Sequence, residues 1–323
     1  MNKTKAILIW ACLTFCMAAN AQAIMQHPWK GKRVAYFGDS ITDPRNSGSQ
    51  RKWWNWLQDW LGIEPYVYAI SGRQWNDIPN QAEKLKAEHG DNFDAILIFI
   101  GTNDFNAAIP IGQWYNVTED SVEAAVHKPR QIVLRKHRQP SFNKDTYRGR
   151  INIAMKRIKE MFPSKQVVLV TPIHRGFFFG NEKNIQPEES YTNEIGEWVD
   201  AYVESVKEAG NIWAVPVIDL NAASGLFPLA NEHLMYFHNE KDLLHPNDAG
   251  HVRMARTMMY QLMALPCTFE RPTKLTKNDQ ADDKKSYYHH CPDTSCLGRF
   301  GTSQQPTGHG GCKQSEGPHT RQP

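Results

Sequence analysis

Four short segments carry the side chains that acyl transfer requires. In chain order they are Gly38-Asp39-Ser40, Gly72, Gly101-Thr102-Asn103-Asp104 and Asp242-Leu243-Leu244-His245. A serine becomes an acyl-transfer nucleophile only when a base lies beside it and hydrogen-bond donors surround the developing oxyanion. The segments hold a candidate for each of these parts.

Each candidate residue suits one role in this chemistry. Ser40 would be the nucleophile and His245 its base, while Asp242, three residues before His245, would hold the imidazole in one tautomer. Gly72 could donate its backbone N–H with no side chain in the way, and Asn103 could donate its side-chain amide. We therefore predict that these residues meet in one active site.

Two of the segments directly follow apolar runs that are typical of buried strands. Residues 33–37 end at Gly38, and residues 95–100 end at Gly101. A six-residue apolar run of the second kind indicates a strand buried on both faces. Open α/β sheets place their active sites at the carboxyl ends of such strands, so we expect the four segments to share one sheet edge.

The rest of the body alternates strand-like and helix-like stretches. Further strands are predicted at residues 66–70, 166–170 and 213–218, and helices at 53–61, 77–89, 146–161, 191–209 and 247–265. This alternation predicts an α/β fold with a parallel sheet covered by helices on both faces. The chain has 323 residues, of which 41% are hydrophobic, enough for one large domain or two small ones.

The four segments give the chain a family resemblance over about residues 32–265. In order and approximate spacing they resemble the blocks of the SGNH hydrolases, also called the GDSL esterase/lipase family. The resemblance implies a three-layer α/β/α, flavodoxin-like fold with a five-stranded parallel sheet. No Gly-x-Ser-x-Gly elbow occurs, which argues against the ordinary α/β-hydrolase arrangement.

The resemblance also implies roles for individual residues. Ser40, Asp242 and His245 would be catalytic. The oxyanion hole would consist of the backbone N–H groups of Ser40 and Gly72 and the side-chain amide of Asn103. It implies no cofactor and no metal.

The first 23 residues have the features of a signal peptide. Lys3 and Lys5 precede an apolar run at residues 6–19, which is short for a membrane span, and Ala21-Gln22-Ala23 is a small-x-small cleavage site. We predict an exported mature chain without a transmembrane segment, which would be periplasmic, surface-associated or secreted. Lipid attachment at Cys16 is a weaker alternative.

A hydrolase domain is predicted at residues 24–269, followed by a polar tail at 270–323. The tail is rich in Lys, Gln, Gly, Pro and Thr and lacks periodicity, so we expect it to be disordered. Outside the signal segment all the cysteines lie near or within it, namely Cys267, Cys291, Cys296 and Cys312. Disulfides or free thiols are favoured there over a metal site, and the body must be stabilised by its core alone.

Two further stretches border the predicted site. Residues 105–150 form a long insertion with a basic cluster between Lys128 and Arg138. It could reach over the site and select anionic or bulky glycans, or it could be a solvated basic loop. Residues 175–180 hold three phenylalanines that could form a wall or a lid.

Composition and export together limit the function. The net charge of +3 gives no indication of nucleic-acid or membrane binding. We expect an exported serine esterase that hydrolyses acyl esters, acetyl above all, on carbohydrate. Its substrate would be a small-molecule or polysaccharide ester. The alternatives are a lipid esterase, such as a lysophospholipase or thioesterase, and a non-catalytic glycan-binding protein on the same fold. The sequence does not predict the oligomeric state.

Overall fold

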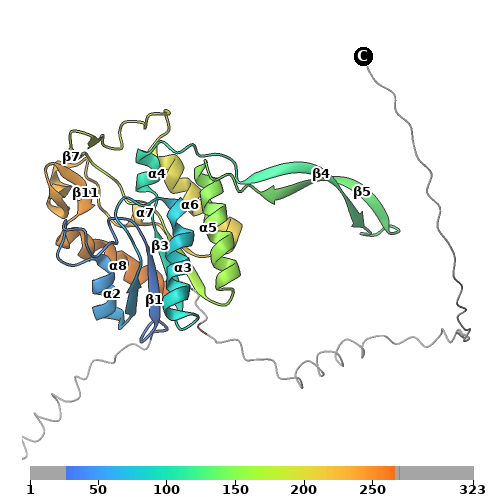
Figure 1. Cartoon of the computed structure of the whole chain (residues 1–323), viewed down its shortest axis with the longest axis horizontal. Coiled ribbons are helices and arrows are strands. Elements are labelled where there is room, and N and C mark those ends of the chain that lie inside the picture. The colour runs from blue at the N-terminus through green and yellow to red at the C-terminus, as the bar shows by residue number, and fades with distance from the viewer. Residues whose placement is uncertain (1–26, 266–268, 270–323) are drawn as a thin grey trace, which may run out of the picture. The chain divides into compact units, whose positions relative to one another are not determined.

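The structure, a computed structural model, describes residues 27–265 and residue 269. Its centre is a parallel sheet of β1 (Arg33–Gly38), β2 (Glu64–Val67), β3 (Ala95–Phe99), β6 (Gln166–Val170) and β9 (Val217–Ile218). The spatial order is β2-β1-β3-β6-β9 (Figure 1). The predicted five-stranded sheet is confirmed. Its strand order reverses between β1 and β3, which is where open α/β sheets form a binding crevice.

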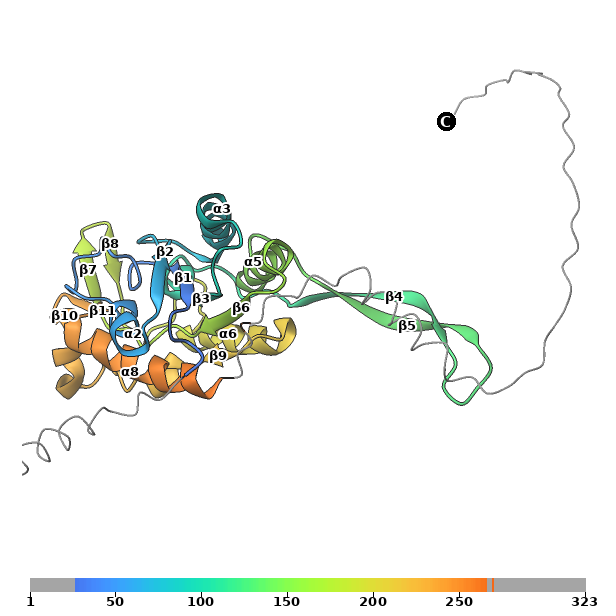
Figure 2. The same ribbon diagram turned by 90° about the horizontal axis from the view of Figure 1, so that it is seen from below.

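Helices cover both faces of this sheet. The buried side chains of α3 (Ile78–His89), α5 (Tyr147–Met161) and α6 (Val199–Trp213) share one core, and those of α2 (Trp53–Leu61) and α8 (Asp248–Ala264) share the other. Figure 2 shows α3 and α5 on one side of the sheet and α2 and α8 on the opposite side. The predicted layered α/β fold is therefore present.

Strand β1 shows why both faces need cover. Successive side chains of a strand point to opposite faces, so Ala35 and Phe37 enter one core and Val34 and Tyr36 enter the other. All four residues are fully buried. A strand buried on both faces appears in the sequence as a continuous apolar run, which is the pattern from which the sheet was predicted.

The second predicted strand, residues 66–70, is displaced in the structure. The regular ladder of β2 covers Glu64–Val67. Beyond it, the backbone N–H groups of Tyr68 and Ile70 still donate to carbonyl oxygens of β1. The chain thus continues alongside β1 after the regular strand has ended.

The boundaries of α6 also differ from the prediction of a helix at residues 191–209. The side chain of Asn193 accepts a hydrogen bond from the backbone N–H of Glu197 at 3.0 Å, which folds this stretch into a turn before the helix begins. The helix then continues to Trp213. The predicted strand at residues 213–218 is correspondingly reduced to the two residues of β9.

The insertion at residues 105–150 is a β-hairpin instead of a loop. After the short helix α4 (Thr102–Asn106), β4 (Tyr115–Ala124) and β5 (Gln131–Pro140) pair antiparallel along their whole length. We call residues 115–140 the arm. It leads away from the sheet edge at which β1 and β3 end (Figures 1 and 2). The expectation that the insertion reaches over the site is therefore wrong.

One buried side chain, that of Asn152 in α5, closes the base of the arm. Its Nδ2 donates to the carbonyl oxygens of Trp114 and Ser141, each at 2.9 Å, and these two residues flank the arm. Its Oδ1 accepts a hydrogen bond from Nε1 of Trp213 at 3.0 Å. The arm is thus joined through Asn152 to both α5 and α6.

A second, smaller sheet was not predicted. Its strands are β7 (Phe178–Asn181), β8 (Asn184–Gln186), β10 (Phe237–Asn239) and β11 (Asp242–Pro246), antiparallel in the order β10-β11-β7-β8. Strands of three to five residues show too little periodicity to be recognised in a sequence. The remaining elements are η1 (Trp75–Asp77), α7 (Leu220–Ala223) and η2 (Asn231–Tyr236).

Several predictions concern parts of the chain outside the described residues. These are the signal segment at 1–23, the tail at 270–323 and the cysteines from Cys267 onward. They stay predictions. Within residues 27–265, no helix is long and apolar enough to cross a bilayer.

Replacing Asn152 by Ala should destabilise the protein. The change removes the acceptor of the Trp213 indole and a donor to Ser141, and it leaves buried polar groups without partners. Each such group costs about 1–3 kcal/mol. We expect the free energy of unfolding, measured by urea denaturation, to fall by about 2 kcal/mol or more. The exposed Asn80→Ala variant on α3 serves as the control, and an equal loss in both would contradict the assignment.

Candidate active site

The end of β1 is fixed by close contacts that only glycine permits. A Cβ atom on Gly38 would lie 2.5 Å from the carbonyl oxygen of Phe99 in β3. The side-chain amide of Gln81 in α3 also accepts from the Gly38 N–H at 2.9 Å and donates to its carbonyl at 3.0 Å. Ser40 follows two residues later, at the crevice between β1 and β3.

A continuous chain of hydrogen bonds joins Ser40, His245 and Asp242. Nε2 of His245 lies 2.8 Å from Oγ of Ser40, and Nδ1 of His245 lies 2.9 Å from each carboxylate oxygen of Asp242. When Nδ1 carries the proton and donates a hydrogen bond to Asp242, Nε2 is free to accept a hydrogen bond from the Ser40 hydroxyl. Ser40 and His245 are 6% and 8% exposed, so this chain is largely shielded from water.

Strand β11 and its neighbour β7 hold the acid and the base in place. Oδ1 of Asp242 accepts hydrogen bonds from the backbone N–H groups of Leu244 at 3.3 Å and His245 at 3.0 Å. Phe178 pairs with Asp242 across the small sheet, and its ring packs edge-on against the imidazole, with 5.4 Å between centroids. Burial alone would raise the pKa of Asp242, but the hydrogen bonds from His245 and these backbone amides outweigh it and lower this pKa.

The turn at Gly72 is held in place by a buried carboxylate. Oδ2 of Asp43 accepts from the backbone N–H and the hydroxyl of Ser71, at 2.8 and 2.9 Å. Burial opposes ionisation of Asp43, yet hydrogen bonds from Arg45 and Ser71 lower its pKa to about 2. Gly72 has a φ of +78°, in the left-handed region that favours glycine, and open space lies where its Cβ would be. The turn is therefore open on the side where a side chain of residue 72 would lie.

The Asn103 amide lies beside this turn. Its Nδ2 donates to the carbonyl oxygen of Arg73 at 3.0 Å and makes a longer contact of 3.4 Å with Oδ2 of Asp39. The carbonyl oxygen of Asn103 accepts from the side chain of Gln74 at 3.0 Å. The first bond fixes the amide next to Gly72, while the second is weak enough to be exchanged for a substrate oxygen.

Two buried carboxyl groups support the site from beneath. Burial raises the pKa of Asp39 to about 7 and that of Asp104 to about 6. Asp104 accepts from the backbone N–H of Trp75 and from Nη1 of Arg150, each at 3.0 Å, and so braces the turn after β3 against η1 and α5. These hydrogen bonds give Asp104 a structural role, because its carboxylate holds the backbone of the turn in place.

Arg175 is a buried residue for which the sequence offered no signal. Its guanidinium donates to the carbonyl oxygen of Thr102 at 3.2 Å and to the side chain of Gln186 at 2.6 Å, and it lies over the ring of Phe105. Burial lowers its pKa to about 10. The cation thus ties the segment after β6 to α4, which carries Asn103.

Three other histidines lie close to predicted strand ends or the last helix but do not join the triad's hydrogen-bonded chain. His174 is 2.5 Å from the buried Glu189, whose hydrogen bond raises the histidine's pKa. The ring of His251 accepts the backbone N–H of Trp53, and burial lowers its pKa well below its usual value. His238 contacts a backbone carbonyl. Packing is the role that these contacts indicate.

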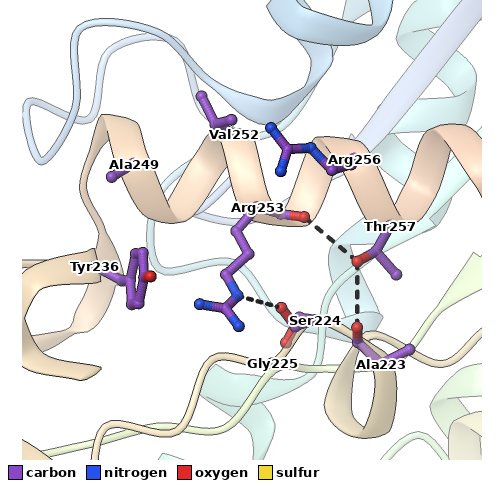
Figure 3. Close-up of a pocket in the computed structure, with 9 residues that line it drawn as sticks. All are labelled: Ala223, Ser224, Gly225, Tyr236, Ala249, Val252, Arg253, Arg256 and Thr257. Atoms are coloured by element: carbon purple, nitrogen blue, oxygen red, sulfur yellow. Dashed lines mark hydrogen bonds between the residues drawn. The ribbon is translucent and has the colours of Figure 1, made fainter. Parts of the chain in front are cut away.

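A separate cavity lies between α7 and α8 (Figure 3). The cavity is lined by residues of these two helices and their neighbours, namely Ala223, Ser224, Gly225, Tyr236, Ala249, Val252, Arg253, Arg256 and Thr257. Arg253 spans it, because Nε donates to the carbonyl of Ser224 at 3.2 Å and the guanidinium lies over the ring of Tyr236. None of these residues belongs to the triad or to the predicted oxyanion hole, and the contacts of Arg253 are structural.

The Asp39 carboxyl should make the protein less stable as pH rises from about 4 to about 7. Its pKa is raised from 3.8 to about 7, so the folded state keeps a proton in this range that the unfolded state has lost. The contribution of Asp39 to the free energy of unfolding is complete below pH 4 and is lost as the pH rises through about 7. The stability advantage of wild type over Asp39→Asn should therefore shrink by about 1 kcal/mol or more across this window.

This dependence can be measured by urea denaturation at intervals between pH 4 and pH 8. The exposed Asp145→Asn variant is the matched control, because its carboxylate pairs with the side chain of the neighbouring Lys144, while its backbone N–H donates to the side chain of Asn143. Parallel pH curves for wild type and Asp39→Asn would show that Asp39 titrates normally.

The comparisons with known proteins agree with this geometry. Among solved structures, a protein from Lactobacillus plantarum has a TM-score of 0.56 and 22% identity, covering 74% of this chain and 99% of that one. A structure described as a possible lipase from Chitinophaga pinensis has a TM-score of 0.53 and 17% identity, covering 73% and 100%. At these identities the likeness shows a shared fold. A comparison with curated proteins finds no match.

The family comparison covers most of the body. The sequence matches the model of the GDSL-like Lipase/Acylhydrolase family over residues 36–253, more than half of its 323 residues. This range includes Ser40, Asn103 and His245. The chain therefore belongs to the GDSL-like lipase/acylhydrolase family, whose members are serine ester hydrolases.

Proposed function

We propose that this acylhydrolase is an exported esterase that removes acyl groups, acetyl above all, from carbohydrate. The observation that carries the catalytic part is the position of His245, which bridges Oγ of Ser40 and the carboxylate of Asp242. The exported location is supported by the signal-like features of the first 23 residues. The carbohydrate substrate is supported by export and by aromatic side chains near the triad.

The proposed mechanism transfers the acyl group in two steps. Oγ of Ser40 attacks the ester carbonyl while Nε2 of His245 takes the hydroxyl proton and returns it to the departing alcohol oxygen. Water, deprotonated by the same nitrogen, then attacks the acyl-serine and releases the carboxylic acid and the free Ser40 hydroxyl. Asp242 keeps its negative charge throughout and stabilises the imidazolium that forms at each step.

Three N–H donors would stabilise the tetrahedral intermediates. They are the backbone N–H groups of Ser40 and Gly72 and the Nδ2 of Asn103. Gly72 has no side chain and open space at its Cβ position, and the hydrogen bond from Asn103 to the carbonyl oxygen of Arg73 fixes the amide beside this turn. Donors held in advance cost no reorganisation when charge develops on the substrate oxygen.

Aromatic side chains near the triad support a sugar substrate. The carbonyl oxygen of Phe177 accepts a hydrogen bond from the backbone N–H of Leu243 in β11, and Phe177 is 38% exposed. Phe178, which is partly exposed, packs edge-on against the imidazole of His245. Aromatic rings offer broad apolar faces on which a sugar ring can stack.

The same side chains favour a second candidate, a lipid esterase, because an acyl chain can pack on them equally well. A third candidate is a glycan-binding protein without chemistry. The unbroken hydrogen-bonded chain from Ser40 to Asp242 favours catalysis over binding alone.

Replacing Ser40 by Ala should abolish ester hydrolysis and leave the fold unchanged. Triad members act as a unit, so kcat should fall on the order of 10³-fold or more. The measurement is hydrolysis of esters with acyl chains of increasing length, together with acetylated polysaccharides. The carbohydrate-esterase proposal expects the highest kcat/KM for acetyl substrates.

Two results would contradict this proposal at different levels. A folded Ser40→Ala variant with near-wild-type turnover would overturn the nucleophile, whereas a preference for long acyl chains would favour the lipid esterase. The exposed Ser190→Ala variant, whose hydroxyl donates to the side chain of Glu188, is the matched control and should retain full activity.

Replacing Asn103 by Ala should lower kcat more than it raises KM. A donor directed at an oxyanion acts mainly in the transition state, and its loss costs roughly 10²–10³ in rate. Steady-state kinetics on an acetyl ester separate the two parameters. Asn106→Ala, an exposed position on the same helix, is the control, and an effect confined to KM would make Asn103 a binding residue instead.

A further inference from the structure

The arm, residues 115–140, is a two-stranded sheet without cover from any other described element (Figures 1 and 2). Apart from Ala124 and Val133, which are partly buried, every residue from 116 to 139 is exposed. An isolated hairpin of this kind is at best marginally stable in water. The described part of the chain therefore leaves the arm without a contact that it needs.

The connection between the strands does not supply this stability. Residues 125–130 join β4 to β5, in place of the two-residue Asn-Gly or Asp-Gly turn that favours hairpins locally. His127 in this connection has a φ of +54°, which is unfavourable for a residue other than glycine. The arm must be stabilised by a surface outside itself.

The outer half of the arm carries exposed apolar side chains. Val122, Val126, Ile132 and Leu134 are 44%, 79%, 76% and 65% exposed. Successive side chains of a strand alternate between faces, so Val122 and its register partner Val133 share one face of the hairpin, and Ile132 and Leu134 share the other. Exposed apolar side chains that gather on adjacent strands mark an interaction site. The face with Val122 and Val133 also carries Asp120 and Arg135.

Charges on the arm are separated by strand. β4 carries only acidic charges and β5 only basic ones, namely Glu119, Asp120 and Glu123 against Arg135, Lys136 and Arg138. In register, Glu119 lies opposite Lys136 and Asp120 opposite Arg135. Three acids thus offset part of the basic cluster noticed in the sequence, which also includes Lys128 and Arg130, and they weaken any attraction of the arm to anionic substrates.

We propose that the arm is a dimerisation element that binds the arm of a second copy of this chain. A surface with one acidic and one basic strand is complementary to itself, which a two-fold interface requires because both copies present the same patch.

The charges restrict how the two arms can meet. Pairing of β4 with β4, or of β5 with β5, would place like charges side by side and is disfavoured. A two-fold axis running along the arms, with the two hairpins packed face to face, places each acidic strand over a basic one. Asp120 then lies over the partner's Arg135, and Val122 lies over the partner's Val133. These two pairs lie on the same face of the hairpin, so they form together, and the opposite face, which carries Ile132 and Leu134, stays outside this contact.

Sedimentation velocity of the purified wild-type protein is the first test, with a dimer as the expected result. A deletion variant then replaces residues 117–138 by Asn-Gly, so that a tight turn joins the facing residues Asn116 and Gln139. This variant should be monomeric and should keep the wild-type kcat/KM on a small acetyl ester, because the arm does not contact the triad. A monomeric wild type, or a dimer that survives the deletion, would overturn the proposal.

Charge reversal tests the self-complementarity directly. The double variant Glu119→Lys, Asp120→Lys makes the arm wholly basic along its middle, and Arg135→Glu, Lys136→Glu makes it acidic. Like-charge contacts at an interface cost several kcal/mol, so each variant alone should dimerise about 100-fold more weakly than wild type. An equimolar mixture should restore a dimer that contains one chain of each kind.

The outcomes of the mixing experiment separate the explanations. Glu194→Lys with Glu232→Lys makes the same change in net charge as Glu119→Lys with Asp120→Lys, but at exposed positions outside the arm, and should leave the dimer intact. Variants that dimerise like wild type, or a mixture that stays monomeric, would overturn the pairing of acidic with basic strands. A wild type that stays monomeric but binds an unrelated protein or a polysaccharide through the arm would overturn the second copy as its partner.

Discussion

The hydrogen bond between Ser40 and His245 is the contact on which the whole site depends. It joins side chains 205 positions apart in the chain, so no local preference can form it. Two independent pieces of structure must meet to make it: the carboxyl end of β1 in the parallel sheet, and β11 in the small antiparallel sheet. The close contact at Gly38 fixes the first, and the pairing of Phe178 with Asp242 fixes the second. The fold serves the site chiefly by bringing these two ends together.

Burial of this contact has an electrostatic consequence throughout the surrounding region. Shielding from water strengthens the interaction of His245 with Asp242, but it also penalises every other charge nearby. Burial raises the pKa of Asp104 to about 6 although Arg150 pairs with its carboxylate, and it raises the pKa of Asp39 to about 7. Arg175, whose charge also acts on Asp39, supplies a buried positive charge nearby. The site thus combines a rigid hydrogen-bonded surround with a carboxyl group that responds to pH near neutrality.

The sequence was sufficient for the central sheet and for the residues that the site brings together. β1 and β3 are continuous apolar runs, and the spacing of Asp242 and His245 in one short segment already places acid beside base. It was not sufficient for the supports. The small sheet consists of strands of at most five residues, and Arg175 is one basic residue among 37. The start of α6 depends on the turn made by Asn193, a tertiary detail that periodicity does not encode.

The arm escaped sequence analysis for a different physical reason. Strand periodicity becomes visible when one face of a strand is buried and the other is solvated, because selection then places apolar and polar residues on alternate faces. On β4 and β5 both faces are exposed within the chain, and the charges vary along each strand and between strands instead of between faces. A pattern of that kind is informative only about what meets the arm from outside. Elements that a protein covers with its own core can be predicted from hydrophobic alternation, whereas an element completed by another molecule is better recognised from unmatched apolar surface and self-complementary charge.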